Sequence, residues 1–272
     1  MKQSGIDSEK IIRRKSDGAF EYQPDDLTIE APLEIRIDSK VVATTMRTPG
    51  HDEELAAGFL VSEAIVHNRE EIAKISVNGE NAADVDLAPG TKLKLSSAQR
   101  FGTISSSCGL CGKTSIEAIR QNFPAIKSKN IRIEIDTLLA LPAKLREQQG
   151  DFGRTGGIHA AGIFGVDGTF KVVREDIGRH NAVDKAIGRA FLDGLLPLDR
   201  HLLLVSGRAS FEILQKALAA GVPIVAAVSA PSSLAVTFAR ESNQTLIGFL
   251  RPPSFNIYAH VERVTLVDDQ PM

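Results

Sequence analysis

The chain has 272 residues, with 34 Asp and Glu against 32 Lys and Arg, which gives a formal net charge of −2. This balance excludes a strongly basic chain that holds nucleic acid mainly by charge. Hydrophobic residues make up 43% and charged residues 24%, which is typical of a globular protein rather than a disordered chain. The length allows one large domain or two small ones.

Two cysteines are too few to form a disulfide scaffold in a chain of this length. Residues 1–18 lack the apolar segment of a secretory signal. The longest uncharged run, residues 217–239, contains glycine and proline, so it predicts a strand, a turn and a helix rather than a membrane span. We therefore expect a cytoplasmic protein that binds neither membrane nor nucleic acid, in which two neighbouring cysteines indicate chemistry or metal binding.

The first third of the chain is expected to be β-rich. Residues 33–38 alternate apolar and charged side chains, the pattern of a half-buried strand, and residues 41–46 follow as a partner strand after a turn. A helix is predicted from Asp52 to Ile65, because three carboxylates in its first turn oppose the helix dipole. Two short strands are predicted near residues 72–77 and 92–95.

From residue 131 on, strands and helices alternate at short spacing, which favours βαβ units on a parallel or mixed sheet. Asp136 is predicted to cap a helix that Pro142 divides or kinks. The other predicted helices cover residues 181–192, 211–220 and 231–241. The predicted strands cover residues 131–135, 158–164, 170–173, 201–205, 223–228 and 245–249.

Cys108 and Cys111 lie in a segment rich in serine and glycine. Thr114 and Glu117 fit a capping box, so Cys111 is expected just before a helix N-terminus, with Lys113 beside it. The helix dipole and the lysine both stabilise a thiolate over a thiol. The sequence therefore indicates an accessible, reactive thiol rather than one buried for packing.

Several interpretations of the cysteine pair remain open: packing in a turn, a thioredoxin-like redox pair, half of a zinc site, or a thiol that carries sulfur as a persulfide. A zinc deaminase shows H-x-E followed later by P-C-x-x-C. His51 and Glu53 precede Cys108 and Cys111 in this order, although Ser107 stands at the proline position. A zinc-dependent hydrolase using these four residues is therefore the alternative function.

Small polar loops follow several predicted strands, at residues 206–210 and 229–233, and Arg251 follows another. In open α/β sheets, ligands bind at the carboxyl ends of strands, where helix N-termini offer N–H groups to phosphates. Arg208 and Arg251 are suited to bidentate phosphate binding. Each loop alone is explained by helix capping, but together they predict a site for a large anionic ligand.

The chain resembles the FdhD family from about residue 27 to residue 258. The residues that carry this resemblance are six blocks in the family's order: 47–60, 107–112, 155–160, 174–185, 206–210 and 229–234. The resemblance implies a mixed α/β (α+β) fold, with a cytidine-deaminase-like mixed sheet, helices on its faces and a smaller β-rich N-terminal region. The corresponding parts are residues 1–100, the cysteine loop and following helix at 101–130, and residues 131–272.

The resemblance also implies a sulfurtransferase that matures formate dehydrogenase. Such a carrier accepts sulfur from a cysteine desulfurase as a persulfide, here on Cys108 with Cys111 assisting. It passes the sulfur to the molybdenum or tungsten bis(molybdopterin guanine dinucleotide) cofactor, a bound client, and no permanently bound metal is expected. The catalytic subunit of formate dehydrogenase is a partner, and a homodimer is expected. The residues expected to bind the cofactor are Arg208, His180, Phe249, Leu250, Arg251, Pro252, Pro253 and Ser254.

Overall fold

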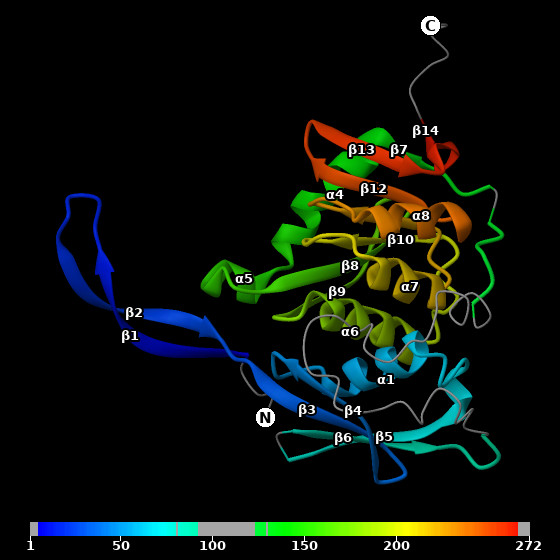
Figure 1. Ribbon diagram of the computed structural model, residues 1–272, viewed down its shortest axis with the longest axis horizontal. Coiled ribbons are helices and arrows are strands. Elements are labelled where there is room, and N and C mark those ends of the chain that lie inside the picture. Colours follow the sequence, from blue (N-terminus) through cyan, green and yellow to red (C-terminus); the bar gives the residue numbers. More distant parts are fainter. Residues whose placement is uncertain (1–4, 80, 92–122, 129, 266–272) are drawn as a thin grey trace, which may run out of the picture.

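The computed structural model describes residues 5–79, 81–91, 123–128 and 130–265. They form a projecting two-stranded ribbon, a four-stranded sheet with one helix on its inner side, and a six-stranded sheet with helices on both faces (Figure 1). The predicted strand at 92–95 and the whole cysteine loop lie outside the described residues.

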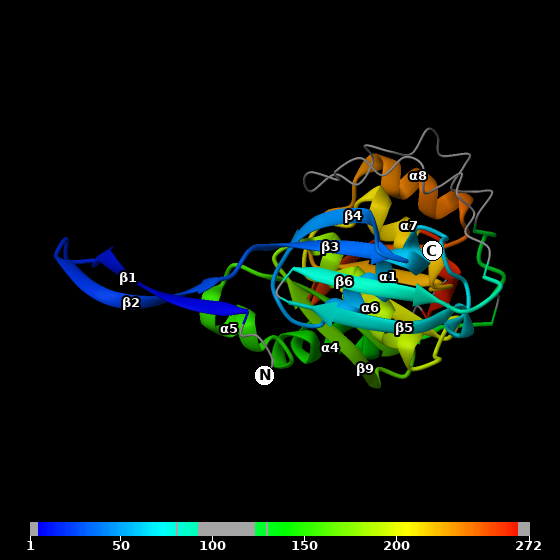
Figure 2. The same ribbon diagram turned by 90° about the horizontal axis from the view of Figure 1, so that it is seen from below.

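The ribbon pairs two antiparallel strands, β1 (Ile6–Arg14) and β2 (Phe20–Thr28), and projects from the body in both views (Figures 1 and 2). The sequence analysis missed both strands, because their many charged residues do not alternate with apolar residues that face a core.

The four-stranded sheet confirms the predicted β-rich region. Its order is β4-β3-β6-β5, with β3 and β4 antiparallel and β3 and β6 parallel. The alternation predicted for β3 is observed, since Leu33, Ile35 and Ile37 are buried. The sequence analysis did not predict β6. The bounds are β3 (Ala31–Ile37), β4 (Lys40–Arg47), β5 (Ile72–Asn78) and β6 (Ala82–Leu87).

The six-stranded sheet has the order β13-β12-β11-β10-β8-β9 and is mixed, as predicted. Strands β10, β11 and β12 are parallel, and β8, β9 and β13 are joined to the sheet by antiparallel pairing. The bounds are β8 (His159–Gly165), β9 (Phe170–Asp176), β10 (His201–Val205), β11 (Ile224–Ala227), β12 (Thr245–Arg251) and β13 (Ser254–Ala259).

Two cores lie on the two faces of this sheet. Helices α6, α7 and α8 cover one face, and α4 covers the other with Leu138, Leu141 and Leu145. The mixed α/β class is thus confirmed, whereas the specific likeness to cytidine deaminase stays a prediction. The bounds are α4 (Ile135–Glu147), α6 (Arg179–Leu192), α7 (Phe211–Ala219) and α8 (Ser233–Glu241).

Several predicted helix ends need correction. Helix α4 has Glu134 at its N-cap, so Asp136 lies in the first turn and is not the cap. Pro142 lies inside this helix and does not divide it. Helix α1 (Asp52–Ser62) begins as predicted but ends before Ile65, because Ala64 has positive φ. The remaining described elements are α5 (Gly150–Thr155), the paired short strands β7 (Ile133–Glu134) and β14 (Val264–Thr265), and the 3-10 helices η1 (Arg69–Glu71) and η2 (Val261–Arg263).

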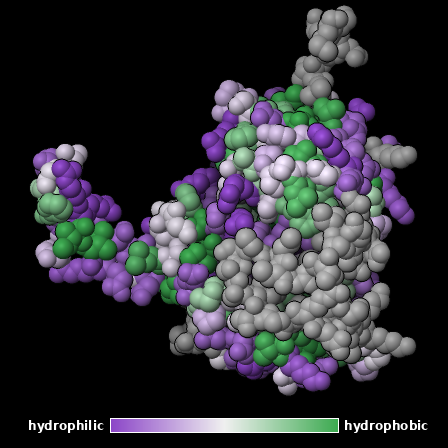
Figure 3. Space-filling model, in the orientation of Figure 1, coloured by the Kyte–Doolittle hydropathy of each residue, from purple (hydrophilic) through white to green (hydrophobic). Residues whose placement is uncertain are grey.

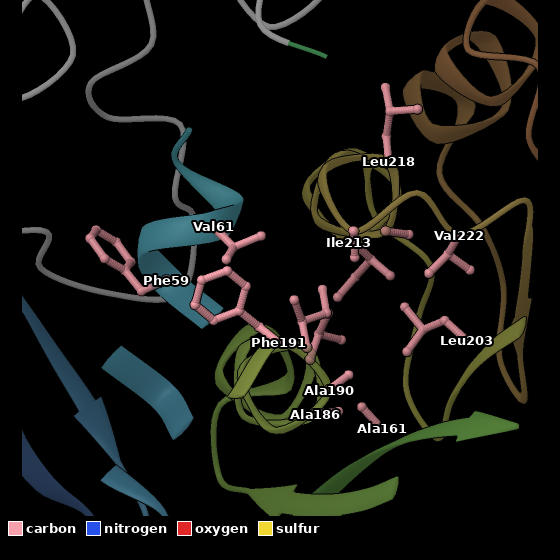
Figure 4. Packing of buried hydrophobic residues seen from close by; sticks show 14 of the residues in the cluster. Phe59, Val61, Ala161, Ala186, Ala190, Phe191, Leu203, Ile213, Leu218 and Val222 are labelled. Carbon is pink, nitrogen blue, oxygen red and sulfur yellow. The ribbon is translucent and has the colours of Figure 1, made fainter. Parts of the chain in front are cut away.

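One core joins α1 to the helices of the six-stranded sheet. In Figure 4, Val61 on α1 lies close to Phe191 on α6, and Ile213 and Leu218 on α7 continue the same packing. The helices α1 and α6 meet backbone to backbone: a Cβ built on Gly58 would lie 1.8 Å from the carbonyl oxygen of Asp184. The proposed boundaries at residues 100 and 130 stay predictions. No helix among the described residues combines the length and apolarity needed to span a membrane.

Candidate functional site

The loops after β10, β11 and β12 are joined by backbone hydrogen bonds at one end of the sheet. The N–H of Ala209 donates to the carbonyl of Ala230 at 3.2 Å, and the N–H of Ser232 donates to the carbonyl of Ala209 at 3.0 Å. The N–H of Phe249 donates to the carbonyl of Ser229 at 3.1 Å. The sequence analysis expected these loops to share one edge, and the structure brings them together there.

His159 borders the same site from the start of β8. Ser206 fixes this strand, because its N–H donates to the carbonyl of Ala160 and its hydroxyl accepts the N–H of Ala160 at 2.9 Å. A Cβ on Gly207 would lie 3.2 Å from Nδ1 of His159 and 3.9 Å from Cβ of Arg179. Burial, followed by the neighbouring Arg179, lowers the pKa of His159. Glycine at position 207 therefore allows the side chains of His159 and Arg179 to approach the loop closely.

His180 lies between two side chains of α7. Its Nε2 is 3.1 Å from the hydroxyl of Ser210, the N-cap residue of α7, and its Nδ1 is 3.4 Å from Oε2 of Glu212. Burial, together with the positive charges of Arg179 and Lys216, lowers the pKa of His180 to about 3. The imidazole is therefore neutral at pH 7. From this network we assign the proton to Nδ1, which faces the carboxylate, so that Nε2 accepts the proton of Ser210.

A buried polar chain continues from Glu212 to α1. Oε1 of Glu212 is 3.9 Å from Nζ of Lys216, which lies 2.7 Å from Oδ2 of Asp184, and Asp184 accepts the hydroxyl of Ser62 at 2.7 Å. Although burial alone would lower it, the carboxylates of Asp184 and Glu212 raise the pKa of Lys216. The lysine is therefore charged, and it holds the carboxylate that orients His180.

The predicted cofactor-binding stretch forms the end of β12 and its turn into β13. Phe249 has φ of +53° and its side chain is 40% exposed, whereas Leu250 is fully buried in the core beneath. Arg251 is exposed, and its Nε donates to the carbonyl of Val228 at 2.9 Å. Pro252, Pro253 and Ser254 are exposed in the turn, as is Arg208 in the loop after β10. The two arginines thus lie at the same edge of the sheet, on either side of the loop after β11.

The residues of the alternative zinc site are only partly described. His51 has φ of +59° at the N-cap of α1, and its Nδ1 lies 3.4 Å from Oε1 of Glu54, while Glu53 is exposed. Cys108, Cys111 and the capping box at Thr114 lie outside the described residues. Within the described ranges no cluster of three His, Cys, Asp or Glu side chains could hold a metal ion. The zinc alternative and the thiolate predictions both stay predictions.

Sequence reasoning gave no structural role to a buried cluster that fastens the loop before α1 to α6. Nζ of Lys185 is 2.7 Å from Oδ2 of Asp176 and donates to the carbonyl of Thr48 at 2.8 Å, and the same carboxylate accepts the N–H of Thr48 at 3.1 Å. Nearby, Arg47 pairs with Asp52 through two hydrogen bonds of 2.9 Å. These residues belong to two of the blocks that carry the family resemblance.

Comparisons with known proteins agree with that resemblance. Residues 28–265 match the FdhD/NarQ family. The sulfur carrier protein FdhD of Streptomyces coelicolor is 50% identical over 268 residues, covering 94% of this chain and 95% of that protein. The sulfur carrier protein FdhD of Mycobacterium tuberculosis is 50% identical over 267 residues, covering 93% and 97%.

A solved structure confirms the fold. The crystal structure of a protein described as a formate dehydrogenase accessory protein from Desulfotalea psychrophila matches with a TM-score of 0.78. It covers 96% of this chain and 100% of that one at 23% sequence identity.

Proposed function

Since the chain belongs to the FdhD/NarQ family, we propose that it is a sulfur carrier that matures formate dehydrogenase. The observation that carries this proposal is the 50% identity, over nearly the whole length of both chains, to relatives named sulfur carrier protein FdhD. The solved structure of similar fold is described as a formate dehydrogenase accessory protein, which supports the same client.

The proposed first step is transfer of one sulfur atom from a cysteine desulfurase to Cys108. The thiolate of Cys108 attacks the outer sulfur of the desulfurase persulfide. A bond forms between the two sulfur atoms while the bond to the desulfurase cysteine breaks, and that cysteine leaves as a thiolate. The sulfur keeps its oxidation state, so no external oxidant is needed. Cys111 assists as a second thiol in the same segment.

The proposed second step delivers this sulfur to the molybdenum or tungsten centre of the bis(molybdopterin guanine dinucleotide) cofactor. The site at the ends of β10, β11 and β12 suits such a cargo, because Arg208 and Arg251 carry positive charge on either side of the loop after β11. Guanidinium groups recognise phosphates bidentately, and helix N-termini favour anions. Neutral His180 and the exposed residues Phe249, Pro252, Pro253 and Ser254 complete the proposed binding surface, while fully buried Leu250 supports this stretch from beneath.

Mass spectrometry of the intact protein tests the sulfur step directly. After incubation with a cysteine desulfurase and free cysteine, we expect the wild-type protein to gain one sulfur atom and to lose it on reduction. Cys108→Ala should gain none, whereas Cys111→Ala should still be loaded but more slowly. An unmodified wild-type mass, or full loading of Cys108→Ala, contradicts the proposal.

A further inference from the structure

The ribbon formed by β1 and β2, residues 6–28, is a fixed arm rather than a loose end. At its base Ile6 is buried, and the N–H of Ile29 donates to the carbonyl of Gly5 at 2.9 Å. Oδ2 of Asp26 lies 2.8 Å from Nη2 of Arg154, and the hydroxyl of Thr28 donates to the hydroxyl of Thr155 at 2.9 Å. These contacts with α5 set the direction in which the arm leaves the body (Figure 1).

One face of the arm is aromatic and cationic. In an antiparallel pair, residues directly opposite each other share a face. The register pairs Ile12 with Tyr22 and Arg14 with Phe20, and these lie on the same face as the next pair, Lys10 and Pro24. The exposed fractions are 58% for Ile12, 70% for Phe20 and 70% for Tyr22. We call Lys10, Ile12, Arg14, Phe20, Tyr22 and Pro24 the aromatic face; Figure 3 shows apolar residues gathered on the arm.

Along the same length, the opposite face of the arm is mostly polar, with one apolar residue, Ile11, and it carries more carboxylates than cations. Its charged residues are Glu9, Arg13, Glu21 and Asp25, and Nη2 of Arg13 lies 3.7 Å from Oδ1 of Asp25. The aromatic face has two cations and no carboxylate, and Nζ of Lys10 lies over the Tyr22 ring, 5.0 Å from its centroid. The two faces thus differ in exposed aromatic surface and in the sign of their net charge, which points to the aromatic face as the one that contacts a partner.

The arm stands beside the candidate site. Its base contacts Thr155 at the end of α5, and the chain then passes through Gly156 and Gly157 to His159, which lies against the loop at Gly207. In Figure 1 the arm leaves the body at the end where β12 turns into β13. A protein that binds the arm is therefore held close to the site from which the cofactor must be transferred.

We propose that the aromatic face of the arm docks on the catalytic subunit of formate dehydrogenase, on an apolar patch bordered by carboxylates. This inference rests on the proposed function, which makes that subunit the receiver of the cofactor. An isolated two-stranded hairpin is marginally stable in water, and exposed aromatic residues beside cations are typical of protein contact sites. A second copy of this chain is a poorer partner, because two aromatic faces packed together would bring the positive charges of Lys10 and Arg14 close to each other.

The test measures binding of the purified full-length protein to the cofactor-free catalytic subunit of formate dehydrogenase. The double variant Phe20→Ser/Tyr22→Ser should bind at least about 10-fold more weakly than the wild type, because aromatic anchors dominate interface energetics. Lys10→Glu/Arg14→Glu should also weaken binding and reverse its salt dependence. The matched control is Glu9→Ser/Gln23→Ser on the polar face, which should bind like the wild type.

The following outcomes would each overturn the docking proposal. Unchanged affinity of both variants does so, as does failure of the wild-type protein to bind the subunit. Conversion of a dimer into a monomer by Phe20→Ser/Tyr22→Ser, seen by light scattering, would assign the arm to a second copy. Loss of binding to a single-stranded oligonucleotide or to anionic vesicles, with binding to the subunit unchanged, would assign it to those ligands. Sulfur loading by the desulfurase, measured in parallel, separates these failures from failure of the proposed function.

Discussion

His180 and Glu212 face each other across the contact between α6 and α7, with Nδ1 of the imidazole 3.4 Å from Oε2 of the carboxylate. Lys216 neutralises this carboxylate from the other side, and Ser210 contacts Nε2. The arrangement resembles a serine, histidine and carboxylate triad, but a pKa lowered to about 3 makes His180 a poor base. We therefore interpret Glu212 as the residue that holds a neutral His180 in one tautomer at the edge of the site.

We predict that His180 stays neutral and protonated on Nδ1 throughout the physiological pH range. The folded pKa, about 3, lies below the ordinary value of 6.5, so the unfolded chain binds a proton first as the pH falls. Stability is therefore unaffected by this group above pH 6.5 and decreases as the pH falls from there to about 3. ¹⁵N NMR of the imidazole nitrogens measures the tautomer directly. An imidazole that titrates near pH 6.5 would contradict the prediction.

Glu54 also contributes stability that is lost as the pH falls, but over a lower pH range than His180. Burial alone would raise its pKa, but hydrogen bonds from Arg174 and the neighbouring His51 lower it to about 2. A carboxylate with a lowered pKa contributes stability that is complete above pH 4.5 and is lost as the pH falls towards 2. We predict that Arg174→Leu destabilises the fold by about 3 kcal/mol at pH 7, because it leaves a largely buried carboxylate without its main partner.

Urea unfolding of Arg174→Leu and the wild type at pH 7 and pH 3 measures this effect. The difference between the two proteins should shrink at the lower pH, where Glu54 of the variant is protonated. Arg132→Leu, at an exposed position just before β7, is the control and should change stability little at either pH. If the difference in unfolding free energy were the same at both pH values, the ion pair between Arg174 and Glu54 would not be its source.

The close crossing of α1 and α6 predicts that Gly188 cannot be replaced. A Cβ at this position would lie 1.8 Å from the carbonyl oxygen of Glu54, so the two helices must separate. We expect Gly188→Ala to destabilise the protein by about 3 kcal/mol, at the upper end of the cost of overpacking. Gly153→Ala is the matched control, because nothing lies within 4 Å of its Cβ position in α5. Thermal unfolding that is equal for the two variants would refute the close crossing.

The sequence predicted those strands and helices in which the spacing of apolar residues reflects one buried face of the element. Strand β3 and the strands and helices from His201 to Glu241 are of this kind, and the structure confirms them within a few residues. Strands β1 and β2 were missed because they cover no core. Strand β13 was missed because its side chains are mostly half-exposed. In each case pairing with a neighbouring strand, rather than an alternating pattern of buried side chains, defines the strand.

The loops of the candidate site were predicted to a similar extent, whereas the roles of their residues stay predictions. Polar loops after β10 and β11 were visible as serine-rich and arginine-containing segments between apolar runs, and the structure places them together. Glu212 and Lys216 were not singled out, because an acid and a base four residues apart in a helix usually form a pair on the surface. Contact with α1 and α6 buries Lys216, and the sequence of α7 alone does not show this contact.

The last prediction concerns the two arginines at the strand ends. If the loops after β10 and β12 bind the phosphates of a guanine dinucleotide, GDP should bind as a fragment of that ligand. Arg208→Ala and Arg251→Ala should each weaken GDP binding by about 10-fold, since a charge-assisted hydrogen bond contributes about 1.5–3 kcal/mol. Arg200→Ala is the control, because this exposed arginine directly precedes β10 and so lies at the opposite end of the strand. Isothermal titration calorimetry at two salt concentrations measures the GDP affinity of each variant and how this affinity depends on salt. Equal affinity of the three variants and the wild type would place phosphate binding elsewhere on the protein.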